Sequence, residues 1–182
     1  SMQSEIENPF FLFVSIATPH FPHVSAPEEF KNQYPEEEIK VAPNVPAEMH
    51  SNVQKELVGY YAHCSATDLA IGGILDKVKE LDMMKNTIIV FTSDHGEIMG
   101  AHGIRIKQKQ VPWNEAASVP LIISYPSSKG LESRQIEMAV TTPDISSSLL
   151  AMAGLKIPDS FEGVDLTKVL MGSKEDSDHG AL

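Results

Sequence analysis

A run of six β-branched and apolar residues at 87–92 (Thr-Ile-Ile-Val-Phe-Thr) is followed directly by Ser-Asp-His-Gly-Glu at 93–97. Such a run predicts a buried strand of a parallel sheet. Ligands of open α/β sheets bind beyond the carboxyl ends of the strands, so Asp94 and His95 would lie at a binding edge. A carboxylate beside an imidazole suits a divalent cation, although the pair alone also fits a surface turn. The segment therefore predicts an α/β fold with a metal or anion site after this strand.

Strand-like apolar runs and helical periodicities alternate along the rest of the chain. They predict strands at 9–16, 87–92 and 119–124, a further edge strand at 138–142, and helices at 54–81 and 144–153. Residues 24–53 are rich in Pro, Glu and Asn and have little periodicity, which predicts a long surface excursion of the kind that often covers a binding site. The order of elements predicts a mostly parallel sheet flanked by helices.

Length and charge exclude several classes of protein. The 182 residues are one domain's worth of chain, and we expect a domain over 3–172 and a disordered polar tail over 173–182. The formal charge of −11 argues against nucleic acid or an anionic membrane as partner. Cys64 is the single cysteine, so no intrachain disulfide can form. We find no signal peptide and no apolar run long enough to cross a membrane.

Three loops that follow apolar runs carry side chains suited to an anion. They contain His20, then Asp94 and His95, then His102, Lys107 and Lys109. A lysine supplies positive charge for phosphate or sulfate oxygens, and a histidine can donate a hydrogen bond to an ester oxygen or a proton to a leaving group. A metal beside them would stabilise charge on the transferred group. The combination predicts hydrolysis of a phosphoryl or sulfuryl ester.

Segments spread over most of the chain resemble the sulfatase family, in the family's order from about residue 9 to residue 171. They are Pro-Phe-Phe-Leu at 9–12 with Pro-His-Phe-Pro at 19–22, Tyr-Tyr-Ala at 60–62 with Asp68, the stretch 86–97, the lysine loop and strand 109–123, and the helix 144–154 followed by Gly163. The resemblance implies an alkaline-phosphatase-like α/β fold, metal-dependent hydrolysis of a sulfate ester as in arylsulfatases, and calcium or, less often, another divalent cation. It slightly favours a periplasmic or extracellular location.

The same resemblance implies roles for individual residues. Asp94 and His95 match two metal ligands, the second of which is Asn in many relatives and His in others, including phosphonate monoester hydrolases. His20 matches a histidine that contacts the sulfate group. A lysine should do the same: counting back from the next strand favours Lys109, whereas counting forward from the metal ligands favours Lys107. The local Lys-Gln-x-Pro-Trp context makes Lys109 our preferred assignment, with His102 as a structural residue.

The chain also departs from the family pattern. Family members carry a formylglycine nucleophile inside C/S-x-P-x-R, and this sequence has no such motif, because Cys64 is followed by Ser-Ala-Thr and Ser25-Ala-Pro by two glutamates. The early strand with paired aspartates and most of the C-terminal subdomain are missing. Calcium prefers six to eight ligands, so two would hold it weakly. We therefore expect an incomplete catalytic domain that is inactive alone, with a dimer or the missing N-terminal half covering its exposed sheet.

Three functions compete on these grounds. A sulfuric ester hydrolase domain is the leading hypothesis. The alternatives are a phosphodiesterase or phosphonate monoester hydrolase of the same superfamily, which the Asp-His pair permits, and a non-catalytic fragment with a structural or interaction role.

Overall fold

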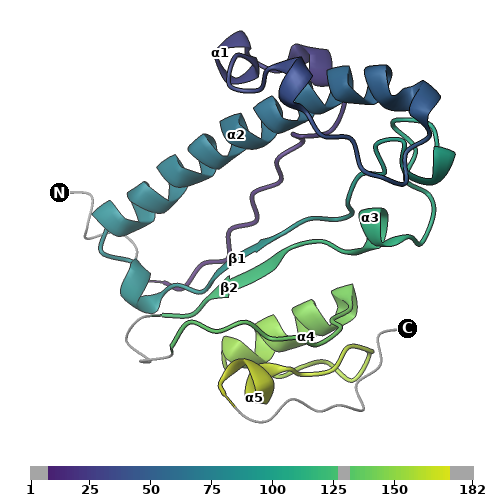
Figure 1. Ribbon diagram of the computed structural model, residues 1–182. Helices are drawn as coiled ribbons and strands as arrows, with labels where there is room; N and C mark the ends of the chain where they lie inside the picture. The colour runs from purple at the N-terminus through teal and green to yellow at the C-terminus, as the bar shows by residue number, and fades with distance from the viewer. Residues whose placement is uncertain (1–7, 127–131, 173–182) are drawn as a thin grey trace. The chain divides into compact units, whose positions relative to one another are not determined.

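The computed structural model of this chain describes residues 8–126 and 132–172, and the chain divides into two compact units between residues 128 and 129. The expected tail at 173–182 lies outside the described residues. In the first unit the main element is the long helix α2, His50–Glu80 (Figure 1). It confirms the helix predicted at 54–81. Its buried residues lie in the N-terminal half, including Val53, Leu57 and Ala62, whereas Leu69 and Leu75 further along are exposed.

Within residues 8–49, four short helices precede α2 and contact it: η2 (His23–Ser25), α1 (Glu28–Lys31), η3 (Glu36–Glu38) and η4 (Ala47–Met49). The expectation of a long excursion without structure is therefore wrong for this segment. Each short helix follows a proline, whose fixed φ sets the chain up to begin a helical turn. Ile39 and Val45, between these turns, are buried against α2, which sequence periodicity could not reveal.

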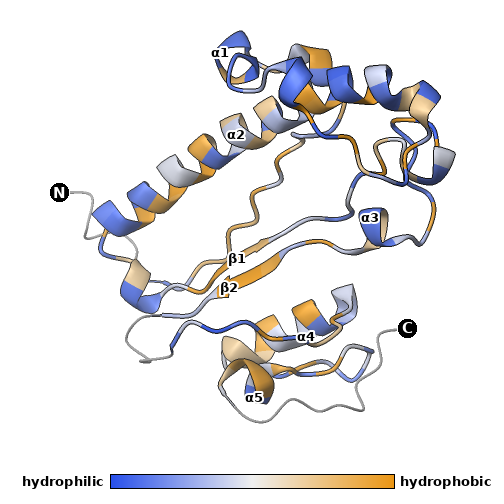
Figure 2. Cartoon of the chain, in the orientation of Figure 1, coloured by the Kyte–Doolittle hydropathy of each residue, from blue (hydrophilic) through white to orange (hydrophobic). Residues whose placement is uncertain are grey.

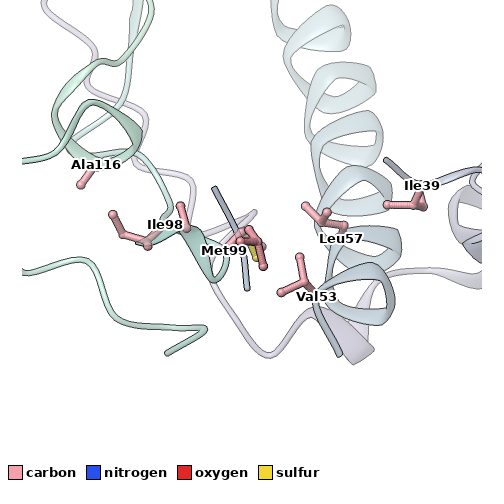
Figure 3. Packing of buried hydrophobic residues seen from close by; sticks show 8 residues of the cluster. Ile39, Val53, Leu57, Ile98, Met99 and Ala116 are labelled. Carbon is pink, nitrogen blue, oxygen red and sulfur yellow. The ribbon is translucent and has the colours of Figure 1, made fainter. Parts of the chain in front are cut away.

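The hydrophobic core of the first unit joins α2 to residues that follow β1 (Ile89–Thr92) (Figure 3). Its buried members are Ile39, Val45, Val53, Leu57, Ile98, Met99, Ala101 and Ala116. Because Ile98 and Met99 follow the segment 93–97 directly in the chain, burial of their side chains against α2 anchors the end of that segment.

The sheet of the described residues is one pair of strands, β1 and β2 (Leu121–Ser124), which lie side by side in Figure 1. The pair is antiparallel, with Ile89 opposite Ser124 and Thr92 opposite Leu121. The expected strands exist, but the predictions that they are buried and belong to a parallel arrangement are wrong for this pair. Phe91 and Ile122 lie opposite each other in this register, and both are exposed.

Residues 9–16 contradict their prediction as a buried strand. The segment is extended but forms no strand, and its apolar side chains are exposed, with Phe13 78% accessible. In Figure 2 this N-terminal segment is drawn as a thin, largely apolar trace and not as a strand arrow. An extended apolar segment becomes a strand only when another strand satisfies its backbone groups, and the described residues supply none here. The predicted edge strand at 138–142 is also absent, because 138–141 have no regular structure and Thr142 begins a helix.

The second unit contains α4 (Thr142–Met152) and α5 (Thr167–Leu170). The helix predicted at 144–153 is confirmed. Asp144 closes a capping box with Thr141 and also accepts a hydrogen bond of 2.8 Å from the backbone N–H of Val164. A side chain at Gly163 would lie 2.1 Å from the Pro143 backbone, so only glycine allows this close approach.

Among the described residues, no helix is long and apolar enough to span a membrane.

Candidate functional site

The segment 93–97 is held in place by a backbone contact at Gly96. Its N–H donates a 2.7 Å hydrogen bond to the carbonyl of Ala116, in the short helix α3 (Asn114–Ala117). A Cβ at position 96 would lie 2.0 Å from the carbonyl oxygen of Glu115, so the two backbones can approach only because residue 96 is glycine. This contact fixes where Asp94 and His95 point after β1.

Asp94 and His95 lie together at the surface of this loop. The Asp94 carboxylate is 84% exposed, and its Oδ2 lies 3.5 Å from Nε2 of His95. The slight burial of Asp94 raises its pKa, but the neighbouring His95, the hydrogen bond from the backbone N–H of His95 and the Ser93 hydroxyl lower it more, so the net pKa lies below the usual value. The carboxylate is therefore ionised at neutral pH.

The ring of His95 is oriented by its own loop. Nδ1 lies 2.8 Å from the carbonyl oxygen of Gly96, which can only accept, so Nδ1 carries the proton of that hydrogen bond. In the neutral ring Nε2 then keeps a free lone pair on the side of Asp94. A ring held in this way through its second nitrogen is the usual arrangement of a metal-binding histidine. Within the described residues, however, no three His, Cys, Asp or Glu side chains gather into a group that could hold a metal alone.

The aromatic ring of Phe21 gathers the predicted anion-binding side chains. The His20 ring stacks on it at 4.3 Å between centroids. Nζ of Lys107 lies 5.5 Å from the centroid and Nζ of Lys109 lies 5.6 Å from it, both within the range of a cation–π contact. His20 donates through Nδ1 to the carbonyl of Phe21, which leaves Nε2 available. The structure therefore brings His20 and both candidate lysines to one place.

Lys109 connects this cluster to the loop after β1. Its Nζ donates to Oε2 of Glu97 at 3.3 Å, and the two side chains are 12% and 7% exposed. The other carboxylate oxygen of Glu97 is buried and has no hydrogen-bond partner among the described residues. Burial raises the pKa of Tyr60 to about 12, with the charges of Cys64 and Glu97 adding to that effect. Sequence reasoning did not single out Glu97, although it is the last residue of the Ser-Asp-His-Gly-Glu segment.

Lys107 has a different setting. Its Nζ lies 3.5 Å from Oε1 of Glu56, on α2, and its side chain is 41% exposed. The other oxygen of Glu56 accepts a 2.6 Å hydrogen bond from Nδ1 of His23, whose side chain is buried. His23 and Glu56 were missed from the sequence, because neither belongs to a recognisable motif and only the packing of η2 on α2 brings them together.

His102 has the contacts of a structural residue. Its ring packs on Trp113 at 3.9 Å between centroids, and Nε2 lies 3.1 Å from Oε1 of Glu115. Its backbone N–H donates to the carbonyl of Asn44, while the Asn44 side chain donates to the same Glu115 oxygen. Hydrogen bonds from its own backbone and from Asn44 lower the pKa of Glu115. Through these contacts His102 connects Asn44, which lies just before η4, to Glu115 in α3. The role of His102 is therefore structural.

Cys64 lies within α2, as expected, and burial raises the pKa of its thiol. A raised pKa means that less thiolate is present at a given pH. We expect iodoacetamide to alkylate Cys64 more slowly than it alkylates free cysteine at pH 8. As the pH is raised, the alkylation rate of Cys64 should reach half of its maximum at a higher pH than the rate for free cysteine does. Mass spectrometry of the intact chain at several pH values measures this, with the urea-unfolded chain as control. Equal rates for folded and unfolded chains would contradict the prediction.

Comparisons with known proteins identify the family to which this geometry belongs. A family model for sulfatases matches residues 2–155. The ulvan-active sulfatase of Formosa agariphila is 44% identical over 180 residues, which cover 99% of this chain and 35% of that protein. The structure of yidJ from Bacteroides fragilis, described as a sulfatase, matches with a TM-score of 0.86 at 30% identity, over 98% of this chain and 40% of its own. The phosphonate monoester hydrolase of Agrobacterium radiobacter matches with a TM-score of 0.83 at 25% identity, over 97% of this chain and 41% of its own.

These matches confirm the alkaline-phosphatase-like α/β fold and its incompleteness. The chain spans about a third of the length of the curated relatives it matches.

Proposed function

This chain belongs to the sulfatase family, and we propose that it supplies the metal-binding and anion-binding part of a sulfuric ester hydrolase site. The observation that carries the proposal is the gathering of His20 and Lys109 on Phe21, with Lys109 joined through Glu97 to the loop that carries Asp94. In this proposal, Lys109 neutralises a sulfate oxygen, and Nε2 of His20 exchanges a proton or hydrogen bond with an ester oxygen.

Calcium is the cofactor that we propose, with Asp94 and His95 as two of its ligands. The ionised, exposed carboxylate and the free Nε2 of the oriented imidazole suit a hard divalent cation. Bound there, the cation would stabilise negative charge on the sulfate group and its attacking oxygen. Two ligands from this chain leave most of the coordination shell to other residues, so the chain alone would bind calcium weakly.

These 182 residues contain no C/S-x-P-x-R motif, which is the motif that would supply the nucleophile. A covalent nucleophile beside a metal is what hydrolysis of this kind requires. We propose that another part of a sulfatase domain, in the same polypeptide or in a second chain, supplies the nucleophile and further metal ligands. The exposed apolar side chains within 10–16, and those of Phe91 and Ile122, support this, since exposed large apolar side chains that gather into a patch mark a contact surface. We also propose a periplasmic or extracellular location for the protein.

A phosphonate monoester hydrolase is the second candidate function. The chain matches such an enzyme at a TM-score of 0.83, and His95 is the residue that the resemblance associates with it. 4-Nitrophenyl phenylphosphonate tested beside 4-nitrophenyl sulfate separates the two functions, because the better substrate is the one with the higher kcat/KM.

The test of the proposed function is reconstitution. We expect the purified chain to release no 4-nitrophenol from 4-nitrophenyl sulfate with calcium present. Joined to the part of the Formosa relative that lies outside the matched region, it should release 4-nitrophenol from this ester. Cys64→Ala should leave that turnover intact. Saturable, calcium-dependent turnover by the chain alone that survives Cys64→Ala would contradict the proposed division of the site.

A further inference from the structure

We infer that Lys107 forms a second anion-binding position beside the sulfate position, so that the preferred ligand carries two negatively charged groups. The inference rests on the proposed function for the first position, to which Lys109 and His20 belong. The second group is an oxyanion, either a carboxylate or another sulfate, on the same molecule.

The distance between the two positions follows from Phe21. The two lysine Nζ atoms lie 5.5 and 5.6 Å from the centroid of one ring, so they are at most about 11 Å apart. One small molecule with two anionic groups can therefore contact both lysines at once. Each lysine can offer an anionic group one charge-assisted contact, in competition with its carboxylate partner, which is Glu56 for Lys107 and Glu97 for Lys109.

The two lysines differ in how firmly they are held. Lys109 and Glu97 form a nearly buried pair, so Lys109 has little freedom to move. Lys107 is 41% exposed and its contact with Glu56 is 3.5 Å long. Glu56 also has a much shorter contact with His23, so its carboxylate stays paired when Lys107 turns toward a ligand. Lys107 can thus exchange its partner while the Glu56 carboxylate keeps its hydrogen bond to His23.

The backbone at Lys107 is held in a conformation that directs its side chain. Its φ is +75°, in the left-handed region that non-glycine residues rarely adopt. The turn from Arg105 to Gln108, closed by a 3.1 Å hydrogen bond, contains it, and Ile104 and Ile106 anchor the preceding residues on the core. Such strain is retained where surrounding structure holds it, and it accompanies ligand-binding positions.

The test uses binding, so it does not depend on turnover. NMR titration of the 182-residue chain compares benzenesulfonate with benzene-1,3-disulfonate and with 3-sulfobenzoate. We expect the two dianions to bind about tenfold more tightly than the monoanion, as for one additional charge-assisted contact. In Lys107→Gln this preference should fall to about twofold or less, and Lys107→Arg should restore it. A preference for only one dianion identifies the second group as sulfate-like or carboxylate.

Lys55→Gln is the matched control, because it removes the same charge from α2 next to Glu56 without a contact to Phe21 among those described. It should keep the preference. Equal binding of monoanion and dianions by the unmodified chain, or a preference that survives Lys107→Gln, would overturn the inference. Failure of the reconstituted protein to hydrolyse sulfate esters would count against the proposed function and leave this binding result interpretable.

Discussion

Replacing Gly96 by alanine is expected to displace the loop that carries Asp94 and His95 from α3 and to destabilise the folded chain. The new Cβ would lie 2.0 Å from the carbonyl oxygen of Glu115, and the 2.7 Å hydrogen bond from the Gly96 N–H to Ala116 would break as the backbones separate. Gly96 does not have a positive φ, so the effect is one of space alone. Overpacking of this kind costs about 3 kcal/mol, which lowers the Tm of a chain this size by roughly 10 °C.

Gly72→Ala is the matched control for this prediction. Gly72 lies in α2 and a Cβ there would meet nothing within 4 Å. The same substitution should therefore stabilise the helix by about 0.5–1 kcal/mol. Thermal unfolding followed by circular dichroism measures both variants. If Gly96→Ala melts at the same temperature as the unmodified chain, the close contact between residues 96 and 115 is not part of the folded structure.

The second large effect is expected from Asp94→Ala in the reconstituted protein. The substitution removes an ionised carboxylate from the proposed calcium site, and with it the charge stabilisation that a bound cation gives to the transferred group. Several kcal/mol of that stabilisation corresponds to a loss of roughly 10³-fold in kcat/KM. The calcium content of the protein, measured by inductively coupled plasma mass spectrometry, should fall in parallel.

Asp76→Ala serves as the control for charge, because Asp76 is an exposed acid on α2. It should change neither calcium content nor turnover measurably. Asp94→Asn keeps the shape of the side chain but not its charge, so it should bind calcium more weakly than the unmodified protein. Full calcium content and full turnover in Asp94→Ala would rule out Asp94 as a ligand.

Local sequence patterns were sufficient for α2 and α4. Apolar residues at helical spacing predict a helix wherever it can bury one face, whereas the capping box of Thr141 and Asp144 at the start of α4 became evident only in the structure. The strands at 89–92 and 121–124 were also located correctly. Their pairing was not, because strand direction depends on which partner the chain brings alongside, and an apolar run carries no information on that.

The site shows the same division. The sequence by itself determined the residue types and the order of the Pro-His-Phe-Pro, Asp-His-Gly-Glu and lysine segments, since these chemical groups are fixed by the chain and its family resemblance. Only the tertiary structure decided that Phe21 collects both lysines, that Glu97 pairs with Lys109, and that Glu56 joins Lys107 to buried His23. The physical reason is that such contacts join segments far apart in the chain, so the partner of each charge depends on tertiary packing that no local pattern encodes.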